Sequence, residues 1–364
     1  MPFRIYVRTD DGCVSNSDAR AQAEITRDMR NMNKTILLIS LPLLAMIAIA
    51  CGNDKVSHDV AYVVDNENNH MYLLDRAGEK SKVLNDAVSN PKWSPNQRMV
   101  AYLANAQDGT GQLKVWHRDT EDFERVSDAP SNVQEFFWSP DSRMIAYQAD
   151  SADKTRSEVF VYDFENEETT TLASEPVGNV ELGNWSGDNN WIVMCLNIDG
   201  TQGIYKRSVR GVDEVQLTDY EDSRPRFSLD GKRVAFARKL SDGSTDIYTL
   251  EVDTGDGPSA AKALTDDDGD EINFEWAPDG RNIIYVSERD GNPEIYAVDT
   301  REKTTRRMTQ NRVDDADPKW SLNGEQVLFR SSNDGKYHLF TMNFKSGSQE
   351  RVLEEENNII TADW

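Results

Sequence analysis

The stretch "FFWSPDSRMIAYQA" occupies residues 136–149, and variants of it recur along the chain. They are "PKWSPNQRMVAYLA" (91–104), "GNWSGDNNWIVMCL" (183–196), "PRFSLDGKRVAFAR" (225–238), "FEWAPDGRNIIYVS" (274–287) and "PKWSLNGEQVLFRS" (318–331). The aromatic residue of the motif recurs at spacings of 42 to 49 residues, at Trp93, Trp138, Trp185, Phe227, Trp276, Trp320 and Trp364. A regular period of this length indicates a repeat architecture.

Each repeat predicts four short strands. The first ends at the aromatic residue, and a Ser-Pro-Asp-Gly-like tight turn follows, in which Pro sets φ and Gly allows φ > 0. The second strand alternates apolar and other residues, so its apolar side chains share one face. The third reads "EVFVYD", "DIYTLE" or "EIYAVD", and the fourth is brief and ends near "VQLTD", "KALTD" or "RRMTQ". Four strands in about 45 residues without helical periodicity predict a β-propeller blade.

The second and third strands each occur seven times, so we predict an all-β fold with seven four-stranded blades over residues 59–364. Six blades plus an irregular extra hairpin is the alternative. The first unit, from "VAYVV" at 60–64, lacks an aromatic strand of its own, and "ITADW" at 360–364 is the unclaimed one. We therefore expect one C-terminal strand and three N-terminal strands to close the ring, with Trp364 between two blades, because unpaired strand edges are prone to association.

The repeat W-S-P-D-G-x-x-[IV]-A-[FY], followed by an Asp-Gly turn and Ile-Tyr, resembles the WD40-like repeat of TolB-type propellers. The same repeat occurs in propellers of prolyl oligopeptidase and dipeptidyl peptidase relatives. The resemblance covers residues 59–364 and implies a periplasmic interaction role, although TolB itself has six blades. No G-x-S-x-G, G-x-x-x-x-G-K or G-x-G-x-x-G motif occurs, so we expect no catalytic residues.

The N-terminal region has the features of an export signal. Residues 36–50 are apolar but too few for a comfortable membrane span, so 32–50 are predicted to be a signal peptide. "AIAC" at 48–51 resembles a bacterial lipobox, which implies a diacylglycerol on Cys51 and a lipid-anchored linker over 51–58. The alternative is an uncleaved signal anchor. Residues 1–31 are interpreted as a mis-called or disordered extension. Gly52, rather than Asp, favours the outer over the inner membrane.

The net charge of −24 argues against nucleic acid as a partner. In a propeller, the loops before the first and third strands of each blade share a face, and many acidic residues fall in them. We expect them to form a negative binding face that attracts a basic partner. Its members would be Glu221, Asp222, Asp266, Asp267, Asp268, Asp270, Glu271, Asp314, Asp315 and Asp317. The alternative is a solvated surface of an acidic chain.

No cofactor is predicted. Residues 265–271 fail the EF-hand pattern, because aligning Gly269 puts Leu264 at the first ligand position. A looser, weakly held Ca²⁺ site using Asp266, Asp268 and Asp270 stays open. His70 and His338 occupy equivalent positions in neighbouring blades and are weak candidates for metal ligands, or simply polar residues at a strand entrance.

Two functions are consistent with these features. The first is a monomeric, non-catalytic propeller tethered by lipid to the bacterial cell envelope, facing the periplasm and binding a protein or other envelope ligand through its acidic face. The second is a propeller enzyme, a metal-assisted lyase or hydrolase acting on a saccharide at the channel mouth. Because propellers support many functions, the fold alone does not decide between the two.

Overall fold

The structure of the 364-residue chain is a computed structural model. It describes residues 6–9 and 12–15 and, from residue 56 onward, all except 57, 67–68, 85–86, 106–109, 128–131, 152, 175–179, 199, 253–260, 267–268 and 354. The chain divides into two compact units, Met1–Asp54 and Lys55–Trp364. In the first, strands β1 (Tyr6–Thr9) and β2 (Gly12–Ser15) pair antiparallel. Cys51 and the predicted signal lie outside the described residues.

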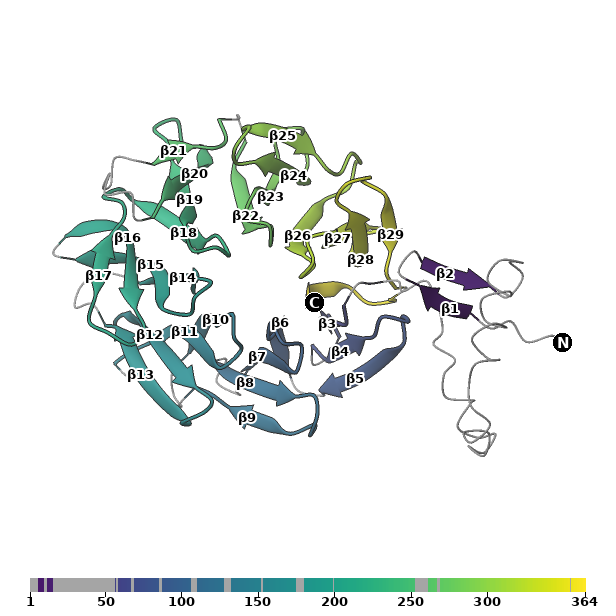
Figure 1. Cartoon of the computed structure of the whole chain (residues 1–364), viewed down its shortest axis with the longest axis horizontal. Coiled ribbons are helices and arrows are strands. Elements are labelled where there is room, and N and C mark those ends of the chain that lie inside the picture. Colours follow the sequence, from purple (N-terminus) through teal and green to yellow (C-terminus); the bar gives the residue numbers. More distant parts are fainter. Residues whose placement is uncertain are drawn as a thin grey trace, which may run out of the picture. The chain divides into compact units, whose positions relative to one another are not determined.

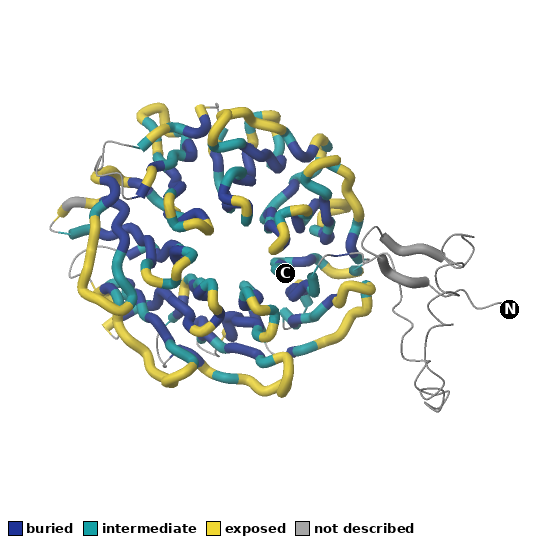
Figure 2. Tube along the Cα trace, viewed as in Figure 1, coloured by how far each residue is buried: buried dark blue, intermediate teal, exposed yellow. Residues whose placement is uncertain are grey.

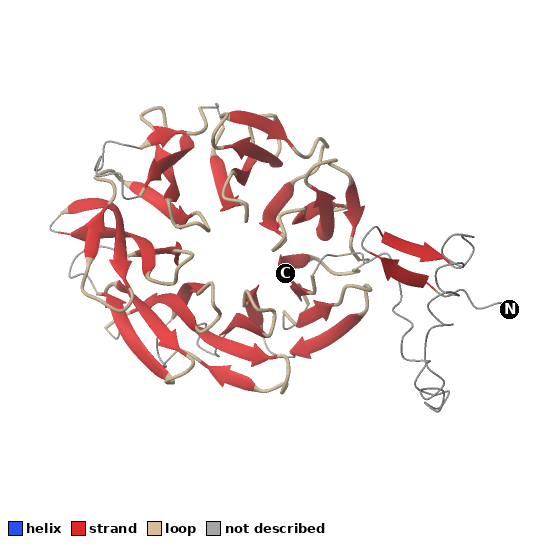
Figure 3. Cartoon of the chain, in the orientation of Figure 1, coloured by secondary structure: helices blue, strands red, loops and turns tan. Residues whose placement is uncertain are grey.

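The second unit is a ring of seven four-stranded antiparallel sheets (Figure 1). The prediction of seven blades is confirmed, and the alternative of six is wrong. Every described segment of regular structure is a strand (Figure 3). Within the described residues, no helix has the length and apolar character needed to span a membrane.

The blades are numbered along the chain, and each is ordered from its inner to its outer strand. Blade 1 consists of β30 (Ile359–Asp363), β3 (Val60–Val64), β4 (Met71–Leu74) and β5 (Lys80–Leu84). Blade 2 consists of β6 (Val88–Trp93), β7 (Met99–Asn105), β8 (Gly111–His117) and β9 (Phe123–Arg125). Blade 3 consists of β10 (Val133–Trp138), β11 (Met144–Asp150), β12 (Ser157–Asp163) and β13 (Glu168–Ala173). Blade 4 consists of β14 (Glu181–Trp185), β15 (Trp191–Ile198), β16 (Thr201–Ser208) and β17 (Glu214–Gln216).

The other three blades have the same order. Blade 5 consists of β18 (Asp222–Phe227), β19 (Arg233–Lys239), β20 (Thr245–Glu251) and β21 (Lys262–Ala263). Blade 6 consists of β22 (Glu271–Trp276), β23 (Asn282–Ser287), β24 (Glu294–Asp299) and β25 (Thr304–Arg307). Blade 7 consists of β26 (Asp315–Trp320), β27 (Gln326–Asn333), β28 (Lys336–Asn343) and β29 (Gln349–Arg351).

Blade 1 closes the ring as predicted. Its inner strand β30 comes from the far end of the chain and pairs antiparallel with β3. Trp364 is only 4% exposed and belongs to an apolar cluster with Val56, Val60 and Leu328. The cluster joins blade 1 to blade 7, because Leu328 lies on β27.

The tight turn after each inner strand has a common hydrogen-bond pattern. In five blades, the buried Ser after the aromatic accepts, through Oγ, the backbone N–H of the residue five positions later. The residue four positions after the aromatic has φ between 60° and 69° in all six described turns. Three of these residues are Gly, which adopts positive φ without strain. They are Gly231, Gly280 and Gly324.

The repeat aromatics pack with apolar residues of the neighbouring blade, in the seams between blades. Buried stretches of the chain occur in the strands of the blades (Figure 2). Five of the repeat aromatics also link neighbouring blades, since the indole Nε1 donates to a backbone carbonyl of the preceding blade at 2.8–3.3 Å. The other two do not, because Phe227 has no indole and the Trp93 Nε1 has no partner among the described residues. In blade 3, for example, Trp138 donates to Lys92 O at 3.0 Å. The last of these links connects Trp364 to Trp320 O at 2.8 Å and so holds the end of β30 against blade 7.

Candidate functional site

The inner strands surround a central cavity of about 440 Å³. Because side chains alternate along a strand, the residue before each repeat aromatic points away from the seam. In all seven blades this residue lines the cavity. We call this set the channel ring; it consists of Lys92, Phe137, Asn184, Arg226, Glu275, Lys319 and Asp363.

A local irregularity of the inner strands adds further polar groups. In four blades, the residue three positions before the aromatic has φ between 49° and 53°, and the strand register shifts there. Such bulges change the direction of a side chain relative to the regular pleat. Three of these residues also line the cavity: Asn90, Asn273 and Asp317.

One side of the channel ring is built around Phe137. The Lys92 ammonium lies 4.3 Å and the Arg226 guanidinium 4.6 Å from the centre of its ring, within cation–π range. Lys92 also forms an ion pair with Glu135 at 2.5 Å. Burial opposes ionisation of Glu135, but Lys92 outweighs this effect and the pKa of the carboxyl falls to about 2. The Lys92–Glu135 pair is therefore charged at neutral pH.

Arg226 has no carboxylate partner among the described residues, because no Asp or Glu oxygen lies within 4.0 Å of its guanidinium. Its Nη1 donates to the carbonyl of Pro225 at 2.9 Å. Burial lowers the pKa of Arg226, yet arginine remains protonated in proteins. The cavity therefore contains a guanidinium with donors available to a ligand.

The opposite side of the ring is acidic. Glu275 lies 3.8 Å from the Lys319 ammonium, and its Oε2 has no hydrogen-bond partner in the described structure. Asp363 accepts the backbone N–H of Trp93 at 2.8 Å through Oδ2. Burial raises the pKa of both carboxyls. The cavity thus presents donors and acceptors of both charges, which suits a polar ligand.

The residues of the predicted acidic face lie in different environments. Glu221, Asp266 and Asp270 are exposed and Asp314 is half-buried, whereas Asp267 and Asp268 lie outside the described residues. Asp317 lines the channel and pairs with Arg330.

The exposed acidic surface does not include Asp222, Glu271 and Asp315, which are 0–1% exposed. Each begins an inner strand at the seam with the preceding blade. Asp222 is held by Arg238 through two hydrogen bonds of 2.7 and 2.8 Å. This part of the predicted face is corrected: position in the repeat, rather than charge, determines the burial of these three.

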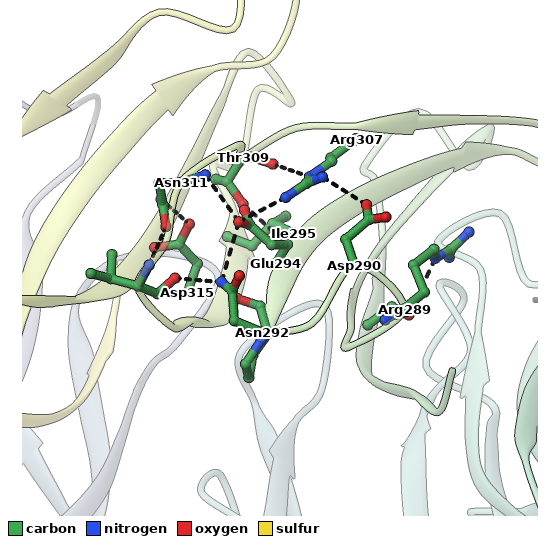
Figure 4. A network of polar contacts seen from close by, with 12 residues as sticks. Arg289, Asp290, Asn292, Glu294, Ile295, Arg307, Thr309, Asn311 and Asp315 are labelled. Carbon is green, nitrogen blue, oxygen red and sulfur yellow. Dashed lines mark hydrogen bonds and ion pairs between the residues drawn. The ribbon is translucent and has the colours of Figure 1, made fainter. Parts of the chain in front are cut away.

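The seam between blades 6 and 7 contains a polar network that the sequence did not reveal (Figure 4). Glu294 is fully buried, and its Oε1 accepts from Arg307 at 3.0 Å, Asn292 at 3.2 Å and the N–H of Asn311 at 3.0 Å. Asp315 accepts from Asn311 Nδ2 at 2.7 Å. Burial raises the pKa of Asp315. Arg307 is the arginine of this network, and it pairs with Glu294 at 3.0 Å and with Asp290 at 2.7 Å.

The seam between blades 5 and 6 also contains a buried carboxyl in a polar network. Glu271 accepts from Thr265 Oγ1 at 3.2 Å, from Ser287 Oγ at 3.4 Å and from Arg289 Nη2 at 3.4 Å. Burial and the neighbouring Asp246 raise the pKa of Glu271 to about 8, against the opposing effect of Arg289. Glu271 is therefore largely protonated at neutral pH.

The two candidate metal ligands form other contacts. His70 Nδ1 lies 3.1 Å from Asn66 Nδ2, and His338 Nδ1 accepts from Arg351 Nη2 at 2.9 Å. The described part of the chain holds no group of three or more His, Cys, Asp or Glu placed to bind a metal ion. The equivalent position in blade 4 is Gly203, where an added Cβ would lie 2.0 Å from the carbonyl oxygen of Thr218.

Comparison with protein families identifies the repeat. The family described as "TolB beta propeller domain" matches residues 54–224 and 212–358. A curated relative, the Tol-Pal system protein TolB of Francisella tularensis subsp. mediasiatica, is 26% identical over 156 residues. The match covers 40% of this chain and 33% of that protein, so it spans about a third of the length of the relative.

Solved structures share the fold at low identity. TolB from Acinetobacter baumannii has a TM-score of 0.53 at 16% identity, covering 85% of this chain and 66% of that one. The propeller of the Trilobed protease from Pyrococcus furiosus has a TM-score of 0.66 at 15% identity, covering 83% of this chain and 94% of that one. An oligogalacturonate lyase in complex with manganese has a TM-score of 0.60 at 14% identity, covering 81% of this chain and 84% of that one. These likenesses show the fold alone, because binding proteins and enzymes share it.

Proposed function

Because the chain belongs to the TolB β-propeller domain family, we propose that it is a non-catalytic binding protein of the bacterial cell envelope. In this proposal the central cavity is the ligand site, and a lipid on Cys51 tethers the propeller to the outer membrane, facing the periplasm. The partner is an envelope protein. The relatives named as Tol-Pal system proteins support an envelope role.

The channel ring is the observation that carries the proposal. Ligand sites typically combine a concave surface with a few convergent polar groups. The ring places charged and amide side chains from six blades, and Phe137 from blade 3, around one cavity. A protein segment inserted there would meet donors, acceptors and an aromatic ring. The exposed acidic residues Glu221, Asp266 and Asp270 would add long-range attraction for a basic partner.

Filling the cavity is expected to abolish capture of the partner. Thr361 lines the cavity and is half-buried, so Thr361→Trp places an indole inside it. Immobilised wild-type protein and variant are incubated with detergent-solubilised envelope, and bound proteins are quantified by mass spectrometry. We expect the specifically captured protein to fall at least about tenfold, the equivalent of about 1.4 kcal/mol.

The matched control is Thr170→Trp, which places the same side chain on the exposed outer strand β13. Equal capture by the two variants would refute the channel as the ligand site. Repeating the wild-type experiment at about 0.15 M and about 0.5 M salt tests the acidic surface, because screening weakens exposed charges. Capture that does not change with salt counts against a role for that surface.

Loss of the lipid is expected to release the protein from membranes. Cys51→Ser removes the thiol that would carry diacylglycerol, and a single lipid modification of this kind adds buried CH₂ groups worth about 0.8 kcal/mol each. Fractionation should find the wild type with membranes and the variant in the soluble fraction. Intact mass should show a mature chain that begins at a lipid-modified Cys51. A wild-type mass that retains residues 2–31 would contradict this maturation.

A further inference from the structure

Two members of the channel ring face each other across the cavity. Arg226 belongs to blade 5 and Asp363 to blade 1. Blades 6 and 7 separate them on one side of the ring, and blades 2, 3 and 4 on the other (Figure 1). Both side chains line the same cavity. A ligand at the centre can therefore reach a guanidinium on one wall and a carboxylate on the opposite wall.

Among the charged residues that line the cavity, these two are the ones without an ion pair in the described structure. Lys92 pairs with Glu135 at 2.5 Å, Lys319 with Glu275 at 3.8 Å, and Asp317 with Arg330. Asp363 has no Lys or Arg nitrogen within 4.0 Å, and Arg226 has no carboxylate oxygen within that distance. The paired residues compensate one another and leave one guanidinium and one carboxyl without a salt-bridge partner.

Each free charge retains hydrogen-bonding capacity. A guanidinium has five N–H donors, and the hydrogen bond from Arg226 to Pro225 O uses one nitrogen. The guanidinium lies 4.6 Å from the centre of the Phe137 ring, a cation–π contact that favours this position of the side chain. Asp363 is oriented by the Trp93 N–H, which occupies Oδ2. Both groups are thus held in place by the fold, which reduces the ordering that a ligand must impose.

We propose that the channel binds a dipolar ligand, an amino acid or short peptide whose carboxylate pairs with Arg226 and whose ammonium pairs with Asp363. The proposal rests on the proposed function, in which the cavity is the ligand site. A simple anion would leave Asp363 uncompensated, and a simple cation would leave Arg226 uncompensated. A ligand that carries both charges satisfies both in one event, and charge-assisted hydrogen bonds are about twice as strong as neutral ones.

The separation of the two charges can be measured with a series of ω-amino carboxylates, from glycine through 4-aminobutyrate and 6-aminohexanoate to 8-aminooctanoate. Isothermal titration calorimetry on the folded wild-type protein should show one chain length that binds best. Hexanoate and hexylammonium, which carry one charge each, should bind at least about tenfold more weakly than that best member. Equal binding of the dipolar and singly charged compounds would overturn the proposal.

A second series separates the two sources of the ligand. Di-, tri- and tetraglycine carry both terminal charges, whereas their N-acetylated and C-amidated forms each lack one. Binding of the free peptides, lost on either modification, indicates a peptide ligand. Binding of the amino carboxylates with no binding of the peptides indicates an amino acid. Failure of both series sinks the inference.

The variants Arg226→Gln and Asp363→Asn test the two walls separately. Each should lower affinity for the best dipolar ligand by about tenfold or more. Arg226→Gln should remove the advantage of that ligand over hexylammonium, and Asp363→Asn should remove its advantage over hexanoate. Arg98→Gln is the matched control, since Arg98 is highly exposed and pairs with Asp119 away from the cavity. Thermal melting confirms that the variants are folded, and a dipolar preference that survives in both of them refutes the assignment.

The outcome for this inference is distinguishable from that for the proposed function. If Thr361→Trp abolishes capture of the envelope protein but no dipolar compound binds, the channel is the ligand site and the dipolar chemistry is wrong. If Thr361→Trp leaves capture unchanged, the proposed function fails, whatever the calorimetry shows.

Discussion

Replacing Trp364 with alanine is expected to lower the free energy of unfolding by about 3–5 kcal/mol, the range for truncating a buried Trp. The indole is 4% exposed, packs with Val56, Val60 and Leu328, and donates to Trp320 O at 2.8 Å. Because small proteins have about 5–15 kcal/mol of stability in total, this one substitution removes a large share of it. Deleting residues 360–364 should be more severe, since it also exposes the edge of β3.

Chemical denaturation of the purified propeller measures this effect. Thr361→Ala is the matched control on the same strand, because Thr361 lines the channel rather than the seam. We expect a much smaller change for this control, and aggregation or a strongly lowered midpoint for the deletion. An unchanged unfolding curve for the deletion would disprove closure of the ring by β30.

Stability should fall as the pH rises from about 4.5 to about 8, and Glu271→Gln should remove part of this dependence. The Glu271 pKa rises from the ordinary 4.5 to about 8 on folding, because burial and Asp246 disfavour its charged form. Between these values the folded state holds a proton that the unfolded state has released. Stability therefore decreases with rising pH, at up to about 1.4 kcal/mol per pH unit for one group.

The sign of the effect makes the test specific. Below about pH 4.5 both states are protonated and the contribution is fully present, whereas above about pH 8 it is lost. Gln resembles the protonated acid, so Glu271→Gln should match the wild type at about pH 4 and exceed its stability at about pH 8.5. Unfolding curves at several pH values measure this difference. The control is Glu288→Gln at an exposed position of the same blade, which should leave the slope of stability against pH unchanged. If Glu271→Gln also keeps the wild-type slope, the prediction is wrong.

The fold could be predicted from sequence because the repeat combines several independent signals. The aromatic of "FFWSPDSRMIAYQA", the tight turn and the alternating second strand recur together, and each has a physical requirement. Positive φ at Gly231, Gly280 and Gly324 confirms the turn chemistry. The closure by residues 360–364 followed from counting strands, since one inner strand was missing and one was unclaimed.

The channel ring was not predicted, although its position in the repeat was available. Six residue types occupy the seven positions before the aromatic, from Lys92 to Asp363, and none recurs often enough to indicate a site. The shared signal is the position immediately before the aromatic. It becomes meaningful only after the closed ring places the seven inner strands around one cavity.

The acidic residues show the converse error. Asp222, Glu271 and Asp315 lie in acidic stretches that look like solvated loops, yet each occupies the first position of an inner strand and is buried in a seam. Charge in a linear stretch does not reveal burial, because Arg238 and Arg289, which compensate Asp222 and Glu271, come from the second strand of the blade and the turn that follows it.

Closure of the ring also affects how the propeller unfolds. A linear array of repeats has two terminal units, each with one neighbour, and can lose them stepwise. Here the pairing of β30 with β3 closes the ring, so every blade has two neighbours. No blade can then fray first as an end unit, and unfolding must begin by breaking two seams together. The propeller should therefore melt in a single concerted transition. Cutting a loop between any two blades moves the chain ends to a new place in the ring, but every blade keeps both of its neighbours.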